Sequence, residues 1–379
     1  MTSKLSLRDF ALVLALLAIC AFFTLKVPDL GFVSARNLSL LMIDFAITAT
    51  LAVGMLLVLL PGHIDLSAGS GVGLIGGISA VLVARHGWPV PAAMACGVAV
   101  ALLLWCAMGN LIVRQRIPAF IITLGGMLVF KGLFWLVIQN RTVPIVIGGQ
   151  SNLYSLLTTY YLPPMAGYTL AAALTATMTV SRLRANAQCR LHALPGDDSE
   201  LSFMKLFMAA QLLFLFVIVT NQFRGIPLPA MILGSIAFCV YLLTRHTPFG
   251  RYLYAIGGNE EAAIISGIPV RKVTIGAFTM MGVIVAITGL MQTAYSGAST
   301  TTIGDLMELD AVAACVIGGV SLKGGRGSVL GVLFGALIMA CLLNGMTLLA
   351  VEPEKKFIAR GLVLILAVWM DQRSQRSAE

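Results

Sequence analysis

The sequence has few charged residues, and this excludes an ordinary water-soluble domain. Only 11% of its 379 residues are Asp, Glu, Lys or Arg, whereas soluble domains carry about 25%. Apolar residues make up 59%, and the mean hydropathy is +0.94. Several apolar segments approach the roughly 20 residues that a helix needs to cross a bilayer. They do not alternate polar and apolar side chains, as a membrane β-barrel requires. We therefore expect a helical membrane protein.

Motifs for catalysis, nucleotides and metals are also missing. The sequence contains no G-x-x-x-x-G-K-[ST] and no Gly-Lys dipeptide, so it has no P-loop. Its four histidines are scattered without metal-ligand spacing, and its seven cysteines include no C-x-x-C pair. The net charge of +9 is spread over short loops and forms no basic face for nucleic acid. We predict a non-enzyme that binds no cofactor, no metal and no nucleic acid.

The apolar segments predict an all-α, polytopic membrane protein with about 12 transmembrane helices. With the N-terminus in the cytoplasm, the inside loops hold 16 Lys and Arg residues and the outside loops hold seven. This positive-inside bias predicts that both termini are cytoplasmic and that the first apolar run is a retained helix. The predicted spans are 10–27, 40–60, 64–84, 92–113, 118–138, 166–181, 205–221, 228–244, 273–293, 309–322, 328–350 and 357–371.

The order of the spans predicts an internal repeat within a single domain, 1–379. Setting aside an inserted pair with its cytoplasmic loop (166–221) leaves two inverted halves, 10–138 and 228–371. Each half has a Gly-rich, interrupted third segment, "HIDLSAGSGVGLIGG" and "LDAVAACVIGGVSLKGGRGS". Paired broken segments in inverted halves indicate a transport pathway near the middle of the membrane. The polar loop 181–204 within the insertion is expected to be loosely ordered.

A cytoplasmic stretch, "YAIGGNEEAAIISGIPVRK", predicts a short helix. Asn259 is a good N-cap, two glutamates fall in the first turn, and Gly267 fits the helix stop before Pro269. So short a helix is unstable alone in water. It could dock into a groove of a soluble partner, or it could lie on the protein's own loops or on lipid headgroups. The candidate docking residues are Gly257, Gly258, Asn259, Glu260, Glu261, Ala262, Ala263, Ile264, Ile265, Ser266 and Gly267.

Three carboxylates, Asp44, Asp65 and Asp310, lie in or at the ends of apolar spans. A charge in the membrane is costly, so such residues usually pair, neutralise or line water. Asp65 could cap the helix that begins near Ser67, or it could face a polar substrate path, and the same two alternatives apply to Asp310. Lys131 could pair with one of the three acids. Asp44 has no assigned role.

Several long motifs resemble one known family. "GHIDLSAGS", "RIPAFIITLGGMLVFKGL", "TPFGRYLYAIGGNEEAAIISGIPV", "LDAVAACVIGGVSLKGGRGSVLG" and "GLVLILAVWMD" are similar to the ribose/xylose-type permease subunits of bacterial monosaccharide ABC importers. The likeness runs from about Ser34 to Asp371. "LNGMTLL", "FRGIPLPAMIL" and the inserted span pair look closest to the D-xylose branch. The sequence departs from the family pattern at His63 and Lys323.

The resemblance implies a multi-pass protein of the bacterial inner membrane that forms a homodimeric pathway in lipid. It implies cytoplasmic ABC ATPase subunits that bind ATP and Mg, a periplasmic sugar-binding protein, and a coupling helix at 258–267. We therefore expect the permease subunit of an ATP-driven pentose importer, with D-xylose as the substrate. Alternatives are ribose or another monosaccharide, or a proton-coupled secondary transporter. The residues expected to line or shape the substrate path are Asp65, Ser67, Ser70 and Asp310.

Overall fold

The computed structural model describes residues 7–146, 149, 151–191 and 199–376. The first helices are α1 (Leu7–Lys26), α2 (Ala35–Leu59), α3 (Ala68–Ala84), α4 (Val90–Gln115), α5 (Ala119–Ile138), α6 (Leu153–Thr159), α7 (Pro164–Leu191) and α8 (Ser199–Asn221). They are followed by α9 (Leu228–His246), α10 (Pro248–Gly258), α11 (Glu260–Ile265), α12 (Val270–Ser296), α13 (Met307–Ile317), α14 (Val329–Leu348) and α15 (Pro353–Arg376). A short 3-10 helix (Pro28–Val33) and two paired strands, β1 (Val143–Pro144) and β2 (Ala298–Ser299), complete the described elements.

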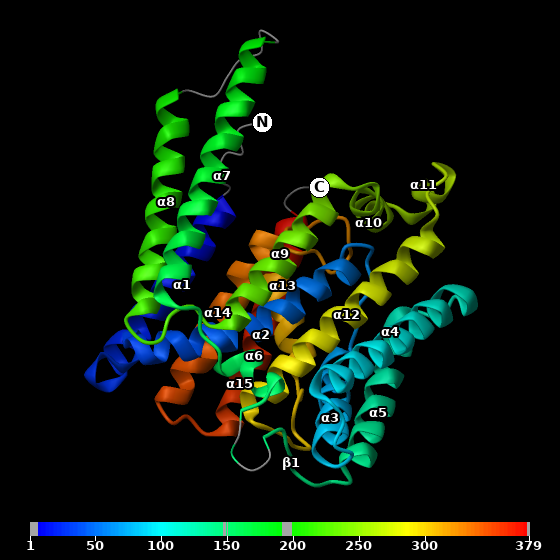
Figure 1. Cartoon of the computed structure of the whole chain (residues 1–379). Helices are drawn as coiled ribbons and strands as arrows, with labels where there is room; N and C mark the ends of the chain where they lie inside the picture. The colour runs from blue at the N-terminus through cyan, green and yellow to red at the C-terminus, as the bar shows by residue number, and fades with distance from the viewer. Residues whose placement is uncertain (1–6, 147–148, 150, 192–198, 377–379) are drawn as a thin grey trace.

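The helices lie where the apolar segments predict them. Twelve helices coincide with the twelve predicted spans, and α6, α10 and α11 lie in the connections (Figure 1). In the described chain, α2, α4, α5, α8, α9, α12 and α14 are long and apolar enough to cross a membrane. Helix α13 has only 11 residues, which is too short for a crossing at 1.5 Å per residue. The protein is therefore an all-α, polytopic membrane protein.

Helices α2 and α12 form the centre of the molecule. Residues 49–60 are all buried, so this part of α2 is surrounded by protein. This agrees with its sequence, which is apolar on every face. Helix α2 packs against α9, α12, α13 and α14, while α12 packs against α2, α3 and α4. Asn37 of α2 and Asn344 of α14 exchange hydrogen bonds of 2.9 and 3.2 Å, which fix these two helices relative to each other.

The contacts among the helices follow a repeated pattern. When α2, α3, α4 and α5 are matched in order with α12, α13, α14 and α15, each major contact has a counterpart. Helix α4 packs on α12 as α14 packs on α2, and α3 packs on α12 as α13 packs on α2. Helix α3 also packs on α4 and α5, as α13 packs on α14 and α15. Two sets of four helices, one from each half of the chain, therefore pack within themselves and against each other in the same pattern.

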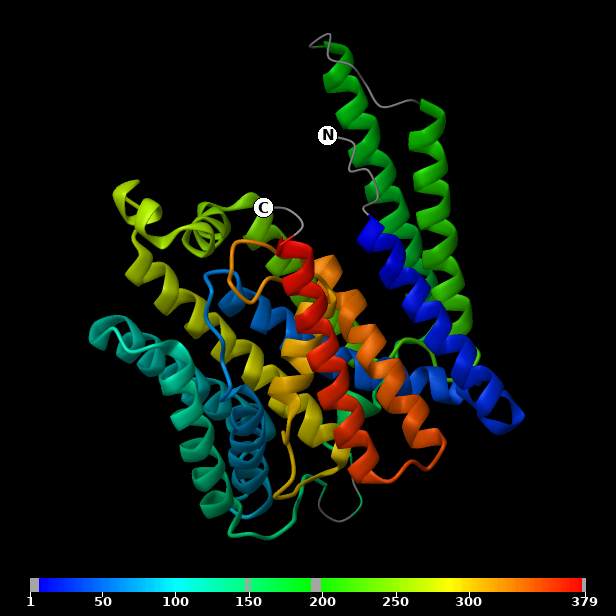
Figure 2. The same cartoon turned by 180° about the vertical axis from the view of Figure 1, so that it is seen from behind.

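The α7–α8 hairpin departs from the prediction of a loose loop at 181–204. Helix α7 continues to Leu191 and α8 already begins at Ser199, and residues 192–198 lie outside the described part. The segment 181–191 is rich in Ala, Leu, Arg and Gln, which are strong helix formers, so the helix continues beyond the apolar span. The two helices pack on each other and extend past the rest of the bundle (Figures 1 and 2).

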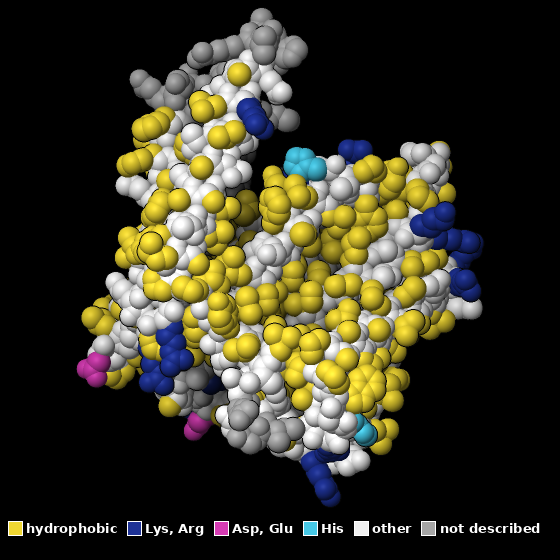
Figure 3. Space-filling model, viewed as in Figure 1, with side chains coloured by type: hydrophobic (Ala, Val, Ile, Leu, Met, Phe, Trp, Pro, Cys, Tyr) yellow, Lys and Arg dark blue, Asp and Glu magenta, His cyan; other side chains and the backbone are white. Residues whose placement is uncertain are grey.

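The surface of the molecule is mainly apolar. Hydrophobic side chains cover the middle of the visible face, whereas Lys and Arg side chains lie toward its two ends and edges (Figure 3). Few residues of helix α8 are fully buried, 11% of its apolar stretch, although the helix packs against α7. Such a surface is suited to contact with lipid rather than water.

Candidate functional site

The first interrupted segment is an extended stretch between α2 and α3. It begins with Gly62, whose φ of +87° is readily adopted only by glycine, and it ends at Ser67. Asp65 lies in this stretch and is completely buried. Its Oδ1 accepts hydrogen bonds from the Ser67 amide at 2.9 Å and from the Ser67 hydroxyl at 2.6 Å, and its Oδ2 accepts one from the indole of Trp105 at 2.6 Å.

These bonds give Asp65 a local structural role. The carboxylate accepts the amide of Ser67, the N-cap residue of α3, so it stabilises the turn that leads into the helix. Within the described chain, no side chain accepts an amide from the first turn of α3 itself, so the structure does not show Asp65 as a helix cap. The bond to Trp105 also connects the segment to α4. Ser67 and Ser70 are buried as well, at 0% and 9% exposure. These three predicted pathway residues are therefore close together, but their side chains point into packed protein.

The fourth predicted pathway residue, Asp310, belongs to the second half of the chain. It lies in the first turn of α13 and is 6% exposed. Its Oδ2 is 3.3 Å from Nη2 of Arg360 in α15. The sequence offered a signal for this partner, because Arg360 is the basic residue inside the last apolar span. Glu308, two residues before Asp310 in the same first turn, is also buried at 6% exposure, and it was not among the residues predicted from the sequence.

Lys131 pairs with a different acid from those predicted. Its ammonium forms an ion pair with Asp305, in the turn before α13, and donates a 2.9 Å hydrogen bond to the Thr301 carbonyl. The prediction that it pairs with Asp44, Asp65 or Asp310 was wrong. The reason is spatial, since α5 lies beside the connection between β2 and α13. Asp44 instead hydrogen bonds with Tyr295.

The second interrupted segment follows α13 and turns back toward α2. Gly324 and Gly325 both adopt positive φ, at +91° and +73°. The Gly325 amide donates a 2.9 Å hydrogen bond to the carbonyl of Leu60, at the end of α2. The two interrupted segments, which are far apart in the sequence, thus meet through their backbones.

The predicted short helix is present as α11. Asn259 accepts a 2.9 Å hydrogen bond from the Ala262 amide, and Gly267 has a φ of +77° after the last turn. The predicted cap and stop are therefore confirmed. Ala263 is buried, whereas Ile264 and Ile265 are 56% and 87% exposed. The helix thus exposes two large apolar side chains, of which Ile265 is almost fully exposed and Ile264 borders a cavity.

Gly257, just before α11, lies against the end of α2, where the first interrupted segment starts, and against the second interrupted segment. A Cβ built there would lie within 3.0 Å of the carbonyl carbon of Gly324, and nearer still to the Leu60 oxygen and the Gly325 nitrogen. We call Leu60, Gly257, Gly324 and Gly325 the glycine junction. Only glycine permits this close approach of three backbones.

A tyrosine reinforces the glycine junction. The hydroxyl of Tyr254 in α10 donates a 2.8 Å hydrogen bond to the carbonyl of Gly327. Burial raises the pKa of Tyr254, while the nearby charge of Arg245 opposes the shift, so the hydroxyl stays protonated and can donate. The α10–α11 unit is therefore attached to the second segment at more than one point.

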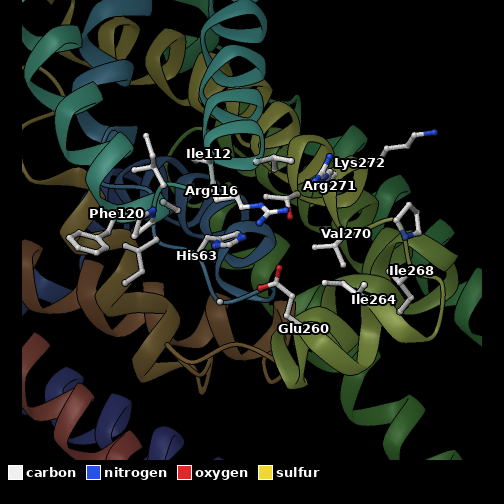
Figure 4. A pocket seen from close by; sticks show the side chains of 18 residues that line it. His63, Ile112, Arg116, Phe120, Glu260, Ile264, Ile268, Val270, Arg271 and Lys272 are labelled. Carbon is white, nitrogen blue, oxygen red and sulfur yellow. The ribbon is translucent and has the colours of Figure 1, made fainter.

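A cavity of about 1070 Å³ lies between α11, the first interrupted segment, the end of α4 and the start of α5. His63, Arg116 and Glu260 point toward its interior (Figure 4). Phe120, Ile264 and other apolar side chains form much of the remaining wall. The cavity thus lies between α11 and the segment that contains Asp65.

Comparisons with known proteins agree on the class of this chain. A family model described as "Branched-chain amino acid transport system / permease component" matches residues 37–368. The xylose transport system permease protein XylH of Escherichia coli (strain K12) is 37% identical, over 98% of this chain and 94% of the relative. XylH of Haemophilus influenzae is 38% identical over 98% of both chains. The ribose import permease protein RbsC of Escherichia coli (strain K12) is 30% identical, over 98% of this chain and 96% of the relative. No solved structure matches.

Proposed function

The chain belongs to the branched-chain amino acid transport system / permease component family, and we propose that it is the membrane subunit of an ATP-driven importer of D-xylose. It is a non-catalytic transport subunit of the ABC sugar permease class. The support for a sugar comes from its relatives, which import xylose or ribose. Identities of 37–38% to the xylose permeases, against 30% to the ribose permease, favour the pentose xylose.

The glycine junction is the single observation that best supports ATP-driven transport by this chain. Helix α11 offers Ile264 and Ile265 to a partner, and Gly257 shortly before it lies against the backbones of the end of α2 and of the second interrupted segment. A movement imposed on α11 by an ATPase would reach the ends of both segments without passing through flexible side chains. We therefore assign residues 257–267 as the coupling element.

The proposed assembly contains two copies of this chain, cytoplasmic ABC ATPase subunits carrying ATP and Mg, and a periplasmic sugar-binding protein. The chain lies in the inner membrane with about twelve crossings and both termini in the cytoplasm. One of these crossings is completed by the short helix α13 together with the non-helical segment that follows it. The first residues of α1 and the last residues of α15 lie on the same side of the molecule as α11, which supports this orientation (Figures 1 and 2). The repeated helix packing supports two inverted halves, 10–138 and 228–371, with the α7–α8 pair inserted.

The four predicted pathway residues are assigned a shaping role. Asp65 and Ser67 fix the turn before α3, Ser70 is buried in the first turn of that helix, and Asp310 holds α13 to α15 through Arg360. Because their side chains are buried, they determine where the interrupted segments run rather than forming the exposed wall. The cavity beside α11 is assigned as the cytoplasmic end of the path.

Reconstitution tests this proposal. Proteoliposomes that hold the chain with its ATPase, and that receive the sugar-binding protein, should accumulate labelled xylose only when ATP is supplied on the cytoplasmic side. Competition by unlabelled xylose should exceed that by ribose. Proton-linked uptake by the chain alone, without the ATPase, would instead support the secondary-transporter alternative and overturn the proposal.

A further inference from the structure

A polar cluster interrupts the apolar surface of α5 in its second half. Lys131 forms an ion pair with Asp305, and its ammonium lies 5.5 Å from the ring centre of Trp135. Lys131 and Trp135 both donate hydrogen bonds to the carbonyl of Thr301, at 2.9 and 3.2 Å. We call these four residues the outer cluster. The side chains of Lys131, Trp135 and Asp305 are thus each held in place by at least one other residue of the outer cluster.

The outer cluster is accessible, unlike the four buried residues expected in the pathway. The Asp305 side chain is 47% exposed and that of Lys131 is 22% exposed, while Trp135 is 43% exposed. An ion pair of this kind is costly against hydrocarbon, so its accessible side is expected to meet water or a polar ligand. The contacts therefore describe a prearranged polar surface rather than a buried core.

The chemistry of the outer cluster suits an uncharged polyhydroxylated ring. The opposite charges of Lys131 and Asp305 cancel, so the cluster offers donors and acceptors but does not favour an ion of either sign. The face of the Trp135 indole turned away from the Lys131 ammonium offers an apolar platform for the C–H side of a sugar ring. The hydroxyls of Thr300 and Thr302, which are 3.2 Å apart, add further hydrogen-bonding groups beside Thr301.

Helix geometry connects the outer cluster to the cavity beside α11. Phe120 lines that cavity, and Lys131 follows it by 11 residues on the same helix. Eleven residues are three turns, so both side chains lie on one face of α5, about 16 Å apart along the axis. The outer cluster and the cavity thus mark two ends of a single exposed helix face.

We propose that Lys131, Trp135 and Asp305 form a low-affinity sugar-contacting site on the periplasmic side of the path, which receives the released monosaccharide. This inference deepens the proposed transport function and rests on it. The exposed face of α5 then guides the sugar toward the cavity near His63.

The test uses the complete transporter in proteoliposomes and measures sugar molecules taken up per ATP hydrolysed. Trp135→Ala, and Lys131→Gln combined with Asp305→Asn, should each lower this ratio roughly three- to tenfold, the size expected from losing one aromatic or polar contact. ATP hydrolysis stimulated by the loaded binding protein should persist. Trp88→Ala is the matched control, because Trp88 is 45% exposed but lies outside the outer cluster. It should leave the ratio unchanged.

Charge reversal separates sugar contact from a purely structural clamp. Lys131→Asp with Asp305→Lys restores an ion pair but moves the donors and acceptors, so the low ratio should remain. Full rescue by this reversal, or an unchanged ratio in Trp135→Ala, would overturn the sugar site. Absence of ATP-dependent uptake in the unmodified transporter would instead refute the transport function itself, so the two failures are distinguishable.

Discussion

The backbone amide of Gly325 donates a 2.9 Å hydrogen bond to the carbonyl of Leu60. This bond joins the segment that follows α13 to the end of α2, and Gly257 lies against both. The two interrupted parts of the chain are therefore not independent of each other, nor of the helix that offers its isoleucines to a partner.

Gly257→Ala tests the glycine junction. The added Cβ meets backbone atoms of Leu60 and Gly325, which cannot rotate away, so the three segments must separate. Overpacking of this kind destabilises by about 1–3 kcal/mol. We expect a lower melting temperature and a loss of ATP-driven uptake. Gly234→Ala in α9 is the matched control, because a Cβ there meets nothing within 4 Å and the residue lies outside the coupling element. Equal uptake in the two variants would contradict the importance of the junction.

Ile265→Glu tests the docking of α11. Ile265 is 87% exposed, so a charged side chain there should leave the melting temperature of the isolated chain unchanged. It should nevertheless prevent insertion of α11 into an apolar groove and abolish copurification with the ATPase. The alternative, in which α11 only lies on loops or headgroups, predicts normal copurification and normal coupled ATP hydrolysis.

The hydrogen bond between Asp65 and Trp105 is tested by a double-mutant cycle. Trp105→Phe leaves a buried acceptor without its donor, and Asp65→Asn disturbs the same bond. Each change should cost about 1–3 kcal/mol of stability, read as a fall in the melting temperature in detergent. The double variant should lose less than the sum, because both changes remove one interaction. Strict additivity would show that the bond contributes little.

For the ion pair of Asp310 and Arg360, we expect the loss of one partner to destabilise the chain more than the loss of both. Arg360→Met leaves a buried carboxylate uncompensated and should destabilise the chain by up to about 3 kcal/mol, with the partial exposure of Arg360, 29%, limiting the loss. Combining it with Asp310→Leu removes the charge and should restore much of the melting temperature. A double variant that is less stable than Arg360→Met alone would contradict this explanation, because the uncompensated carboxylate would then not be the cause of the loss.

The sequence predicted correctly those features that are determined by residues close together in the chain. Asn259 and Gly267 fixed the limits of α11, because a cap and a left-handed stop act within a few positions. The apolar runs likewise predicted the positions of twelve helices, because hydrophobicity is also a property of neighbouring residues. The polar segment after α7 was predicted poorly, since its polarity was given more weight than its helix-forming residues.

The distant pairings could not be predicted in this way. Lys131 and Asp305 are 174 positions apart, and nothing in the sequence of either segment specifies the other. Asp65 could be placed at the start of α3, but the donor from Trp105 depends on how α4 packs. The burial of Ser67 and Ser70 likewise follows from the packing of α3, whereas their polarity alone suggested an exposed path.

The glycine junction is built from peptide groups, and peptide groups are the same in every protein. Under the proposed coupling, the glycine junction therefore transmits movement in the same way whichever sugar is transported and whichever side chains contact that sugar. Substitutions on the exposed face of α5 can change which molecule is carried without altering the junction. Sugar selectivity and coupling to the ATPase can therefore evolve independently in this chain.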